Sequence, residues 1–149
     1  MNIIGLITII TFLIDRLLKI IISSNFKINY SYKIIDKFFY ITNCHNKGAA
    51  FSILNNNVIF LILVSIIVLV FILKLIKKNN NASIILKICY GILLGGILGN
   101  LFDRIFLGYV IDYLDFILFG FDFAIFNFAD MCIVISVILL LFIEKGEKI

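Results

Sequence analysis

Long apolar runs alternate with short polar segments along most of the chain. The plainest run is Val58 to Leu73, in which a single serine is the one polar residue, and no charged residue occurs between Lys47 and Lys74. An apolar run of this length crosses the roughly 30 Å hydrocarbon layer of a membrane as one helix. We therefore predict a transmembrane helix over about 57–76.

The first run, about 3–22, is long enough to span as well, although its second half contains Asp15, Arg16 and Lys19. Asp15 and Lys19 are four residues apart, so they share one helix face and can pair. The sequence leaves open whether this pair is only structural or faces a polar interior. In either case it predicts a second transmembrane helix.

A third span is predicted over about 84–102. It contains three glycines at four-residue spacing, namely Gly91, Gly95 and Gly99. Glycines at this spacing form a flat ridge on which another membrane helix packs closely. At the end of the span, Asn100, Asp103 and Arg104 follow the i, i+3, i+4 spacing and form one polar face beside that ridge.

The fourth run, Met131 to Ile143, has only 13 residues and is too short to span alone. Extending it back to Phe123 gives a span of about 123–143. This extension places Asp130 inside the membrane boundary, with Asn127 on the same face. A carboxylate in that position is by default a candidate functional residue.

Between the first two spans the pattern changes to short polar and aromatic pieces. Residues alternate from Lys37 to Thr42, and turn formers follow from Asn43 to Gly48. We predict short extramembrane strands over about 24–56. The single histidine, His45, has no partners at a metal-ligand spacing, and we interpret it as a surface-loop residue.

Composition places the chain among integral membrane proteins. It is 63% hydrophobic and 15% charged, with a mean hydropathy of +1.18, well outside the range of soluble domains. The net charge of +4 comes from basic residues in short loops, so it argues against a nucleic-acid surface. Cys44, Cys89 and Cys132 have no CxxC spacing, which favours small buried side chains over a disulfide or a metal site. We expect neither metal nor cofactor.

Four spans put both termini on one side of the membrane. The 74–87 hairpin and the C-terminal tail together carry six basic residues, and the opposite side carries five. Basic residues weigh most in short loops near helix ends, so the dense 74–87 hairpin is predicted to be cytoplasmic. The aspartates of the chain then face outward.

Most of the acidic residues lie between Gly95 and Asp130. They are five of the nine Asp and Glu residues in the chain: Asp103, Asp112, Asp115, Asp122 and Asp130. Two carboxylates that share one proton can cleave a peptide, because the ionised one activates water and the protonated one polarises the carbonyl. Asp130 is the strongest candidate, and spacing alone leaves Asp15, Asp103, Asp112 and Asp115 open as its partner.

Three other functions fit parts of the sequence. A proton- or ion-coupled transporter would also place aspartates in membrane helices, but nearer the bilayer centre and in repeated halves. A structural membrane subunit would explain the glycine ridge but not the gathered carboxylates. A Ser-Lys peptidase could use Ser23 or Ser24 with Lys19, although neither serine has a secure position in the span.

Five sequence pieces, in order, resemble one family. They are Asp15-Arg16-Leu17-Leu18-Lys19; Asn46-Lys47-Gly48-Ala49-Ala50-Phe51; Gly95-Gly96-Ile97-Leu98-Gly99-Asn100-Leu101-Phe102-Asp103-Arg104; Val110-Ile111-Asp112-Tyr113; and Phe126-Asn127-Phe128-Ala129-Asp130. Each is weak alone, but together they cover nearly the whole chain. The chain resembles lipoprotein signal peptidase, or signal peptidase II, the intramembrane aspartic peptidase family A8.

The resemblance implies particular roles for particular residues. It makes Asp112 and Asp130 the catalytic dyad. The residues that would position the dyad or the substrate are Asn46, Gly96, Asn100, Asp103, Arg104, Asn127 and Ala129. Asp15 and Lys19 would have a more structural role, whereas Asp115 and Asp122 match no motif and are interpreted as solvated loop charges. Arg104 could also pair with Asp103.

The resemblance also implies a fold, a substrate and a location. The fold is an all-α polytopic membrane protein, one domain over 1–149, with four transmembrane helices and a small extramembrane β-sheet cradle. A mobile loop near 107–121 would cover the site. The substrate is a prolipoprotein carrying diacylglyceryl-cysteine, cut just before that cysteine. The enzyme would lie among lipids of the bacterial cytoplasmic (inner) membrane, with its site facing the outer side of that membrane. We expect it to act as a monomer.

Overall fold

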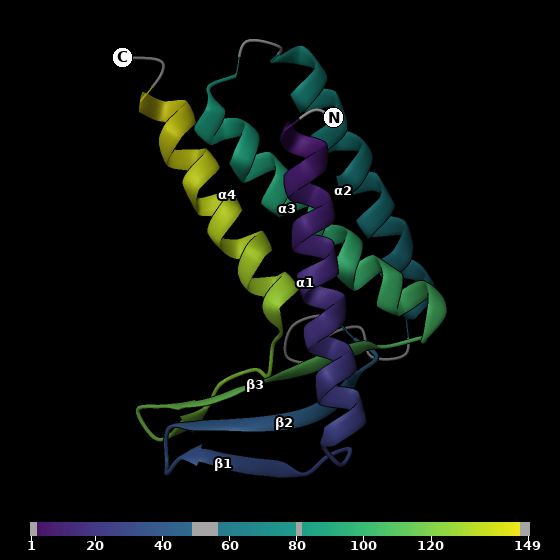
Figure 1. Ribbon diagram of the computed structural model, residues 1–149, viewed down its shortest axis with the longest axis vertical. Helices are drawn as coiled ribbons and strands as arrows, with labels where there is room; N and C mark the ends of the chain where they lie inside the picture. Colours follow the sequence, from purple (N-terminus) through teal and green to yellow (C-terminus); the bar gives the residue numbers. More distant parts are fainter. Residues whose placement is uncertain (1–2, 49–56, 80–81, 147–149) are drawn as a thin grey trace.

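The computed structural model describes residues 3–48, 57–79 and 82–146. Figure 1 shows the helices above a sheet, with the starts of α1 and α3 and the ends of α2 and α4 remote from the sheet. In chain order the elements are α1 (Ile3–Asn25), β1 (Ser31–Ile35), β2 (Phe39–Asn46), α2 (Val58–Lys78), α3 (Ile84–Phe106), β3 (Val110–Leu118), β4 (Phe121–Asp122) and α4 (Phe128–Gly146).

Helix α3 is the centre of the helical part, with contacts to α1, α2 and α4. Its glycines explain how closely α1 approaches. A Cβ added at Gly91 would lie 2.7 Å from the Ile7 Cβ, and one added at Gly95 would lie 2.5 Å from the Thr11 Cβ. The predicted glycine ridge is therefore the surface against which α1 packs, since any larger residue would push the helices apart.

Helix α2 differs from α3 in its surroundings. Leu61 is its one buried residue, whereas α3 buries residues along its whole length. Many α2 side chains are exposed and apolar, such as Ile59 at 76% and Ile67 at 66%. Within the described residues, α2 and α3 are long and apolar enough to cross a membrane, while α1 carries three charged residues and the apolar part of α4 is shorter.

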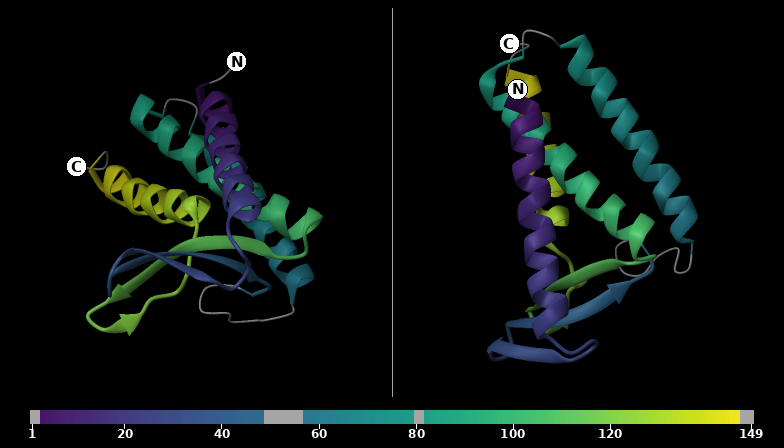
Figure 2. Two further views of the ribbon diagram at one scale, coloured as in Figure 1. Left: turned by 60° about the horizontal axis from the view of Figure 1, so that its bottom comes forward. Right: turned by 45° about the vertical axis from the view of Figure 1, so that its right-hand side comes forward.

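The strands form one antiparallel sheet in the order β1-β2-β3-β4. The sheet lies across one end of the helices, with β3 nearest to them and β1 farthest away (Figures 1 and 2). A cluster of Ile22 from α1 with Ile111 and Tyr113 from β3 joins the two parts. The predicted strands between the first two spans are present as β1 and β2, within the described part of 24–56.

The structure corrects the expectation of a loop over 107–121. Residues 110–118 form β3, which pairs with β2 along most of its length. Only residues 107–109 and 119–120 lie outside helices and strands there. The protein is consequently not all-α, because half of its sheet comes from the segment between α3 and α4.

The fourth helix also differs from its prediction. It begins at Phe128 and reaches Gly146, so it does not extend back to Phe123. Residues 123–127 instead lead from β4 into the helix, with Phe126 bonded to Leu114 of β3 through backbone hydrogen bonds of 2.8 and 3.1 Å. His45, expected in a loop, lies in β2 and stacks on Tyr109 at 3.9 Å between ring centroids.

Candidate active site

The first turn of α4 fixes Asp130 through a reciprocal pair of hydrogen bonds with Asn127. The backbone N–H of Asp130 donates to Asn127 Oδ1 at 3.0 Å, and the Asn127 backbone N–H donates to Asp130 Oδ2 at 3.2 Å. A side chain before a helix that exchanges bonds with a residue three positions later is the capping-box arrangement. The Asn127-x-x-Asp130 spacing thus sets both the helix start and the carboxylate position.

Asp112 approaches the same place from β3. Asn127 Nδ2 donates to Asp112 Oδ1 at 2.6 Å, and Asn46 Nδ2 donates to Asp112 Oδ2 at 2.8 Å. Asn46 is on β2, whose antiparallel pairing with β3 sets Asn46 opposite Val110 and Cys44 opposite Asp112. Asn127 therefore bonds to Asp112 through its side-chain amide and to Asp130 through its backbone N–H.

Three asparagines surround these carboxylates, and the side-chain oxygen of each accepts a hydrogen bond. Gly48 N donates to Asn46 Oδ1 at 2.8 Å, and Lys19 Nζ donates to Asn100 Oδ1 at 2.9 Å. The third, Asn127 Oδ1, accepts from Asp130 N as described. An amide whose oxygen is occupied in this way presents its NH₂ group to its other neighbour. Asn100 Nδ2 accordingly donates to Asp130 Oδ1 at 2.7 Å.

A second group of charges lies between α1 and α3. Lys19 Nζ is 2.9 Å from both Asp15 Oδ2 and Asp103 Oδ2, and all three side chains are fully buried. Arg16 forms an ion pair with Asp103 from the other side. Buried charges are tolerated when each has partners of opposite sign. The predicted Asp15–Lys19 pair is present, and its partners make it part of a larger cluster.

This charged cluster is bonded to the elements that carry the candidate dyad. Asp15 Oδ1 accepts from the backbone N–H of Ala129 at 3.2 Å, next to Asp130. Asp103 Oδ2 accepts from the backbone N–H of Ile111 at 3.2 Å, next to Asp112. Two buried aspartates thereby hold the backbone positions adjacent to the two candidate catalytic ones.

Gly96 and Ala129 lie where α3 and α4 touch. A Cβ added to Gly96 would be 2.7 Å from the Ala129 carbonyl oxygen, and Ala129 is fully buried. Both residues therefore determine how closely α4 approaches α3 at the level of Asp130. Neither is among the residues that line the pocket described below.

Arg16, and not Arg104, is the arginine that pairs with Asp103. Arg104 does not pair with Asp103, which is bonded instead to Arg16, Lys19 and Ile111 N. Arg104 lines the pocket, and its Nη1 is 3.5 Å from Asn100 O. Sequence reasoning gave Arg16 no role, although its place between Asp15 and Lys19 was a usable signal.

A pocket of about 550 Å³ opens beside the two carboxylates. Asp112, Asp130, Asn46 and Arg104 are its polar wall. The rest is apolar and comes from β3, from the segment before α4 and from α4 itself: Val110, Phe123, Ala124, Ile125, Phe126, Met131, Ile133, Val134 and Ile135. A mostly apolar cavity with a few convergent polar groups is the usual form of a ligand site.

The environment of Asp112 suits a group that exchanges a proton near neutral pH. Burial, and after it the charge of the nearby Asp130, raise the pKa of Asp112 to about 7, although the amide hydrogen bonds from Asn46 and Asn127 oppose the rise. A carboxyl group with such a pKa is partly protonated at neutral pH. It can therefore act as an acid or a base there.

The remaining candidates lie apart from this site. Asp115 is not a loop charge, because it belongs to β3 and accepts a 2.6 Å hydrogen bond from Thr42 Oγ1. Asp122 is exposed in β4. In the part of the chain that the structure describes, no three His, Cys, Asp or Glu side chains could hold a metal ion together. Ala49, Ala50 and Phe51 of the second motif lie outside the described residues.

Comparison with known proteins identifies the family. The model of the family described as signal peptidase (SPase) II matches residues 7–144. The chain belongs to the signal peptidase II family. The lipoprotein signal peptidase of Staphylococcus carnosus (strain TM300) is 37% identical over 147 residues, covering 96% of this chain and 92% of that protein. That of Staphylococcus aureus (strain JH9) is 36% identical over 136 residues, covering 91% and 83%.

Solved structures agree with this signal peptidase II assignment. One described as a bacterial membrane enzyme structure by the in meso method at 2.3 Å resolution has a TM-score of 0.87 and 34% identity, covering 96% of this chain and 87% of that one. A second, at 1.9 Å resolution, has a TM-score of 0.81 and 35% identity, covering 92% and 88%. The predicted activity class, an aspartic peptidase of the signal peptidase II type in a membrane, is confirmed.

Proposed function

We propose that Asp112 and Asp130 are the catalytic dyad of this signal peptidase II. The observation that carries the proposal is the Asn127 bridge: one residue bonds to both carboxylates, through its side chain to Asp112 and its backbone to Asp130, at the wall of the pocket. Neutral amides hold the two groups without removing their ability to take up a proton. The pair is expected to titrate as a unit that carries one shared proton near neutral pH.

In the proposed reaction, water sits between the two carboxyl groups. The ionised carboxylate takes a proton from the water while the water oxygen attacks the carbonyl carbon of the scissile peptide bond. The protonated carboxyl group gives its proton to the carbonyl oxygen. The tetrahedral intermediate then collapses, the C–N bond breaks, and the amide nitrogen leaves with the proton first taken from water. The proton given to the carbonyl oxygen returns to the carboxylate that donated it, which restores the singly protonated pair.

The other site residues support this chemistry in two ways. Asn46, Asn100 and Asn127 orient the carboxylates through their NH₂ groups. Arg104, on the pocket wall, is available to donate to a substrate carbonyl or carboxylate. Asp15, Lys19 and Asp103, with Gly96 and Ala129, position α1, α3 and α4 around the dyad.

We infer that the substrate is a prolipoprotein whose cysteine carries diacylglycerol, cleaved just before that cysteine. The two staphylococcal relatives are lipoprotein signal peptidases, and the apolar pocket wall suits a substrate that is itself embedded in lipid. Val134 and Ile135 line the pocket and are also 56% and 49% exposed on α4. A lipid-borne substrate could therefore reach the dyad from within the membrane.

We further propose that residues 1–149 are one domain with four membrane-spanning helices, acting as a monomer in the bacterial cytoplasmic membrane. The ends of α1 and α4 remote from the sheet and the basic α2–α3 junction would lie in the cytoplasm, and the sheet and dyad on the outer side (Figure 1). Lys74, Lys77, Lys78 and Lys87 flank that junction. A single cysteine at Asn79 should be labelled only from inside, and one at Asn29 only from outside, in a chain lacking its native cysteines.

The decisive experiment is cleavage by the purified full chain. The enzyme in lipid vesicles should release the signal peptide from diacylglyceryl-modified prolipoprotein and leave the unmodified precursor intact. A chain with Asp130→Asn is the matched control. Equal cleavage of both precursors, or of the modified one by the control, would overturn the proposal.

A further inference from the structure

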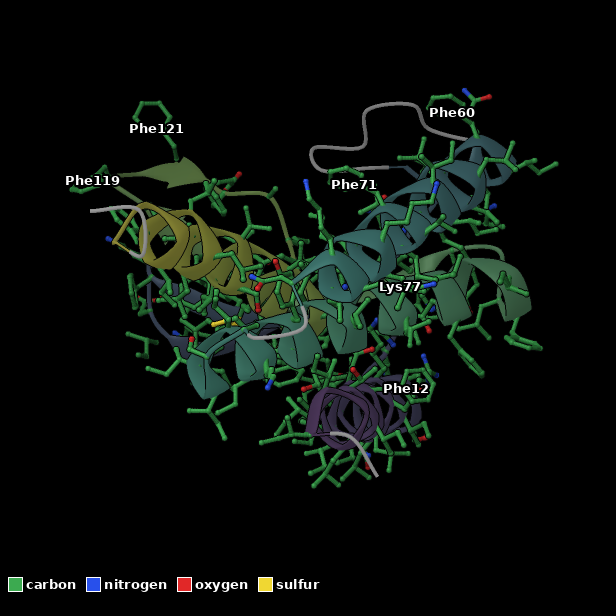
Figure 3. The ribbon with its side chains drawn as sticks, turned by 90° about the horizontal axis from the view of Figure 1, so that it is seen from above. Phe12, Phe60, Phe71, Lys77, Phe119 and Phe121 are labelled. Atoms are coloured by element: carbon green, nitrogen blue, oxygen red, sulfur yellow. The ribbon has the colours of Figure 1, made fainter. Side chains whose placement is uncertain are left out.

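The turn between β3 and β4 exposes a concentration of aromatic surface. Phe119 is 99% and Phe121 79% exposed, and the adjoining Leu118 and Phe123 are 38% and 47% exposed. We call residues 118–123 the aromatic tip. Figure 3 shows Phe119 and Phe121 projecting from the edge of the molecule, beyond α4 and away from the other helices. Large side chains exposed together in this way mark an interaction surface.

The tip shares a face with the pocket. Side chains alternate along β3, so Leu118 is on the same face as Asp112. Leu118 is paired directly with Phe121, and cross-strand partners share a face. The Phe116 ring links this face to the pocket wall by stacking on Phe126 at 5.7 Å between centroids. The apolar surface is therefore continuous from the exposed side of α4, through the pocket, to the tip.

The neighbouring hairpin turn, between β1 and β2, is different in character. It is mixed, because the exposed Lys33–Asp36 ion pair at 3.3 Å and the exposed Lys37 lie among exposed apolar side chains, namely Ile34, Ile35 and Phe38. Figure 1 shows both turns on the same side of the sheet, with the β1–β2 turn farther from the helices than the tip. The tip, which has no lysine, is thus the turn nearer to the helices, and the turn with Lys33 and Lys37 is the one farther from them.

Both turns have a non-glycine residue in the left-handed region, which is Lys37 at φ 57° in the β1–β2 turn and a phenylalanine in the tip. Phe119 has φ 54° and Gly120 has φ 81°. The left-handed region is unfavourable for a residue with a large side chain, and tight hairpins normally place Asn, Asp or Gly there. A phenylalanine in that position is disfavoured both by its backbone and by its exposure to water, so it is best accounted for by a contact that the isolated chain does not make.

We propose that the aromatic tip inserts into the boundary between headgroups and acyl chains of the outer leaflet, beside α4. The proposal rests on the membrane placement given under the proposed function. Aromatic side chains favour that layer, and apolar residues on a polar scaffold bind it through burial of their surface. Asp122 is the only charged residue of the tip, so the contact requires no anionic lipid. It would hold the sheet, and with it Asp112, at a fixed height beside Asp130.

The chain contains no tryptophan, so one introduced at the tip is a unique fluorescent probe. We would compare Phe119→Trp and Phe121→Trp with Ile34→Trp, which lies near the β1–β2 turn and is 55% exposed. Each variant would be placed in phosphatidylcholine vesicles, with and without lipid brominated on the upper acyl chain. Iodide in the external solution would report exposure to water.

We expect both tip variants to show blue-shifted emission that brominated lipid quenches and iodide does not. Ile34→Trp should show the reverse, which controls for the affinity of tryptophan itself for membranes. Iodide quenching at both tip positions would overturn the proposal, and so would shielding from both quenchers, which would indicate a protein contact. Cleavage of modified prolipoprotein by the wild type in the same vesicles tests the proposed function separately. The proposed function and the insertion of the tip can therefore fail independently.

Discussion

Aspartates occur in two adjoining layers of this protein, and their surroundings are opposite. In the layer between α1 and α3, Asp15 and Asp103 are fully buried and lie against the cations of Lys19 and Arg16. In the layer beside the pocket, Asp112 and Asp130 are bonded mainly to neutral amides. Asn100 joins the layers, since it accepts from Lys19 and donates to Asp130.

The difference shows how one residue type can perform two tasks. Asp15 and Asp103 contribute position, because their oxygens are already bonded to the lysine, the arginine and backbone N–H groups. A desolvated carboxylate held by amides keeps a pKa near the working pH, as Asp112 does at about 7. The cationic layer therefore holds the elements of the site in position, and the amide layer is the one suited to catalysis.

The largest effect should come from the amide layer. Asp112→Asn and Asp130→Asn should each lower kcat by at least roughly 10²–10⁴-fold, because an amide cannot exchange the shared proton. Both variants should remain folded and inserted in the membrane. The measurement is the initial rate of prolipoprotein cleavage together with thermal unfolding in detergent. Near wild-type turnover by either variant would remove the functional distinction between the layers.

The cationic layer should respond through stability instead. Lys19→Met leaves Asp15 and Asp103 short of a buried counter-charge, and breaking such a pair typically costs about 3–5 kcal/mol. We expect a marked loss of thermal stability or failure to accumulate in membranes. Lys77→Met, at the exposed end of α2, is the control and should unfold like the wild type. A stable Lys19→Met protein that lost only kcat would instead place Lys19 in the chemistry.

Asn100 tests the link between the layers. Asn100→Leu removes the amide hydrogen bond to Asp130 and one acceptor from Lys19. Loss of a hydrogen bond to a charged group is worth about 1.5–3 kcal/mol, so kcat should fall about 10- to 100-fold with KM little changed. The exposed Asn25→Leu serves as control. Unchanged kcat would show that Asp130 does not depend on the cationic layer.

The smallest effect is a shift in pH dependence. The singly protonated dyad gives a bell-shaped profile, and activity is lost as pH rises through the upper pKa, near 7 for Asp112. The Asn46 N–H stabilises ionised Asp112, so Asn46→Leu should raise that pKa and move the alkaline limb upward by up to about one unit. Asp115→Asn should leave both limbs in place. A large shift in the Asp115 variant would make Asp115, rather than Asp112, the partner of Asp130.

Several features followed from local sequence alone. Apolar length predicted the four helices, and the four-residue glycine spacing predicted the ridge that receives α1. The i, i+4 spacing predicted the Asp15–Lys19 pair. The Asn127-x-x-Asp130 cap was also readable, and would have set the start of α4 at Phe128 instead of Phe123. Each of these features depends on residues only a few positions apart, so the local sequence pattern is enough to predict it.

The local sequence could not identify the proposed catalytic partner of Asp130. Periodicity left Asp15, Asp103, Asp112 and Asp115 equivalent, and the resemblance alone singled out Asp112. In the structure, β3 pairs with β2, which lies more than 60 residues earlier, and the register of that pairing puts Asn46 beside Asp112. Because β3 is apolar on both faces near Asp112, its sequence lacks the alternation that reveals a strand, and nothing in the local pattern opposed the loop that the resemblance implied there.

The sequence by itself determined the membrane class, the helices and the set of polar residues available for chemistry. Only the tertiary structure decided which aspartates lie beside cations and which lie beside amides. The reason is that a carboxylate's protonation depends on charges and dipoles within a few ångströms, and here those groups come from α1, α3, β2 and the start of α4. Their arrangement is fixed by packing and strand register, which no single segment of the chain contains.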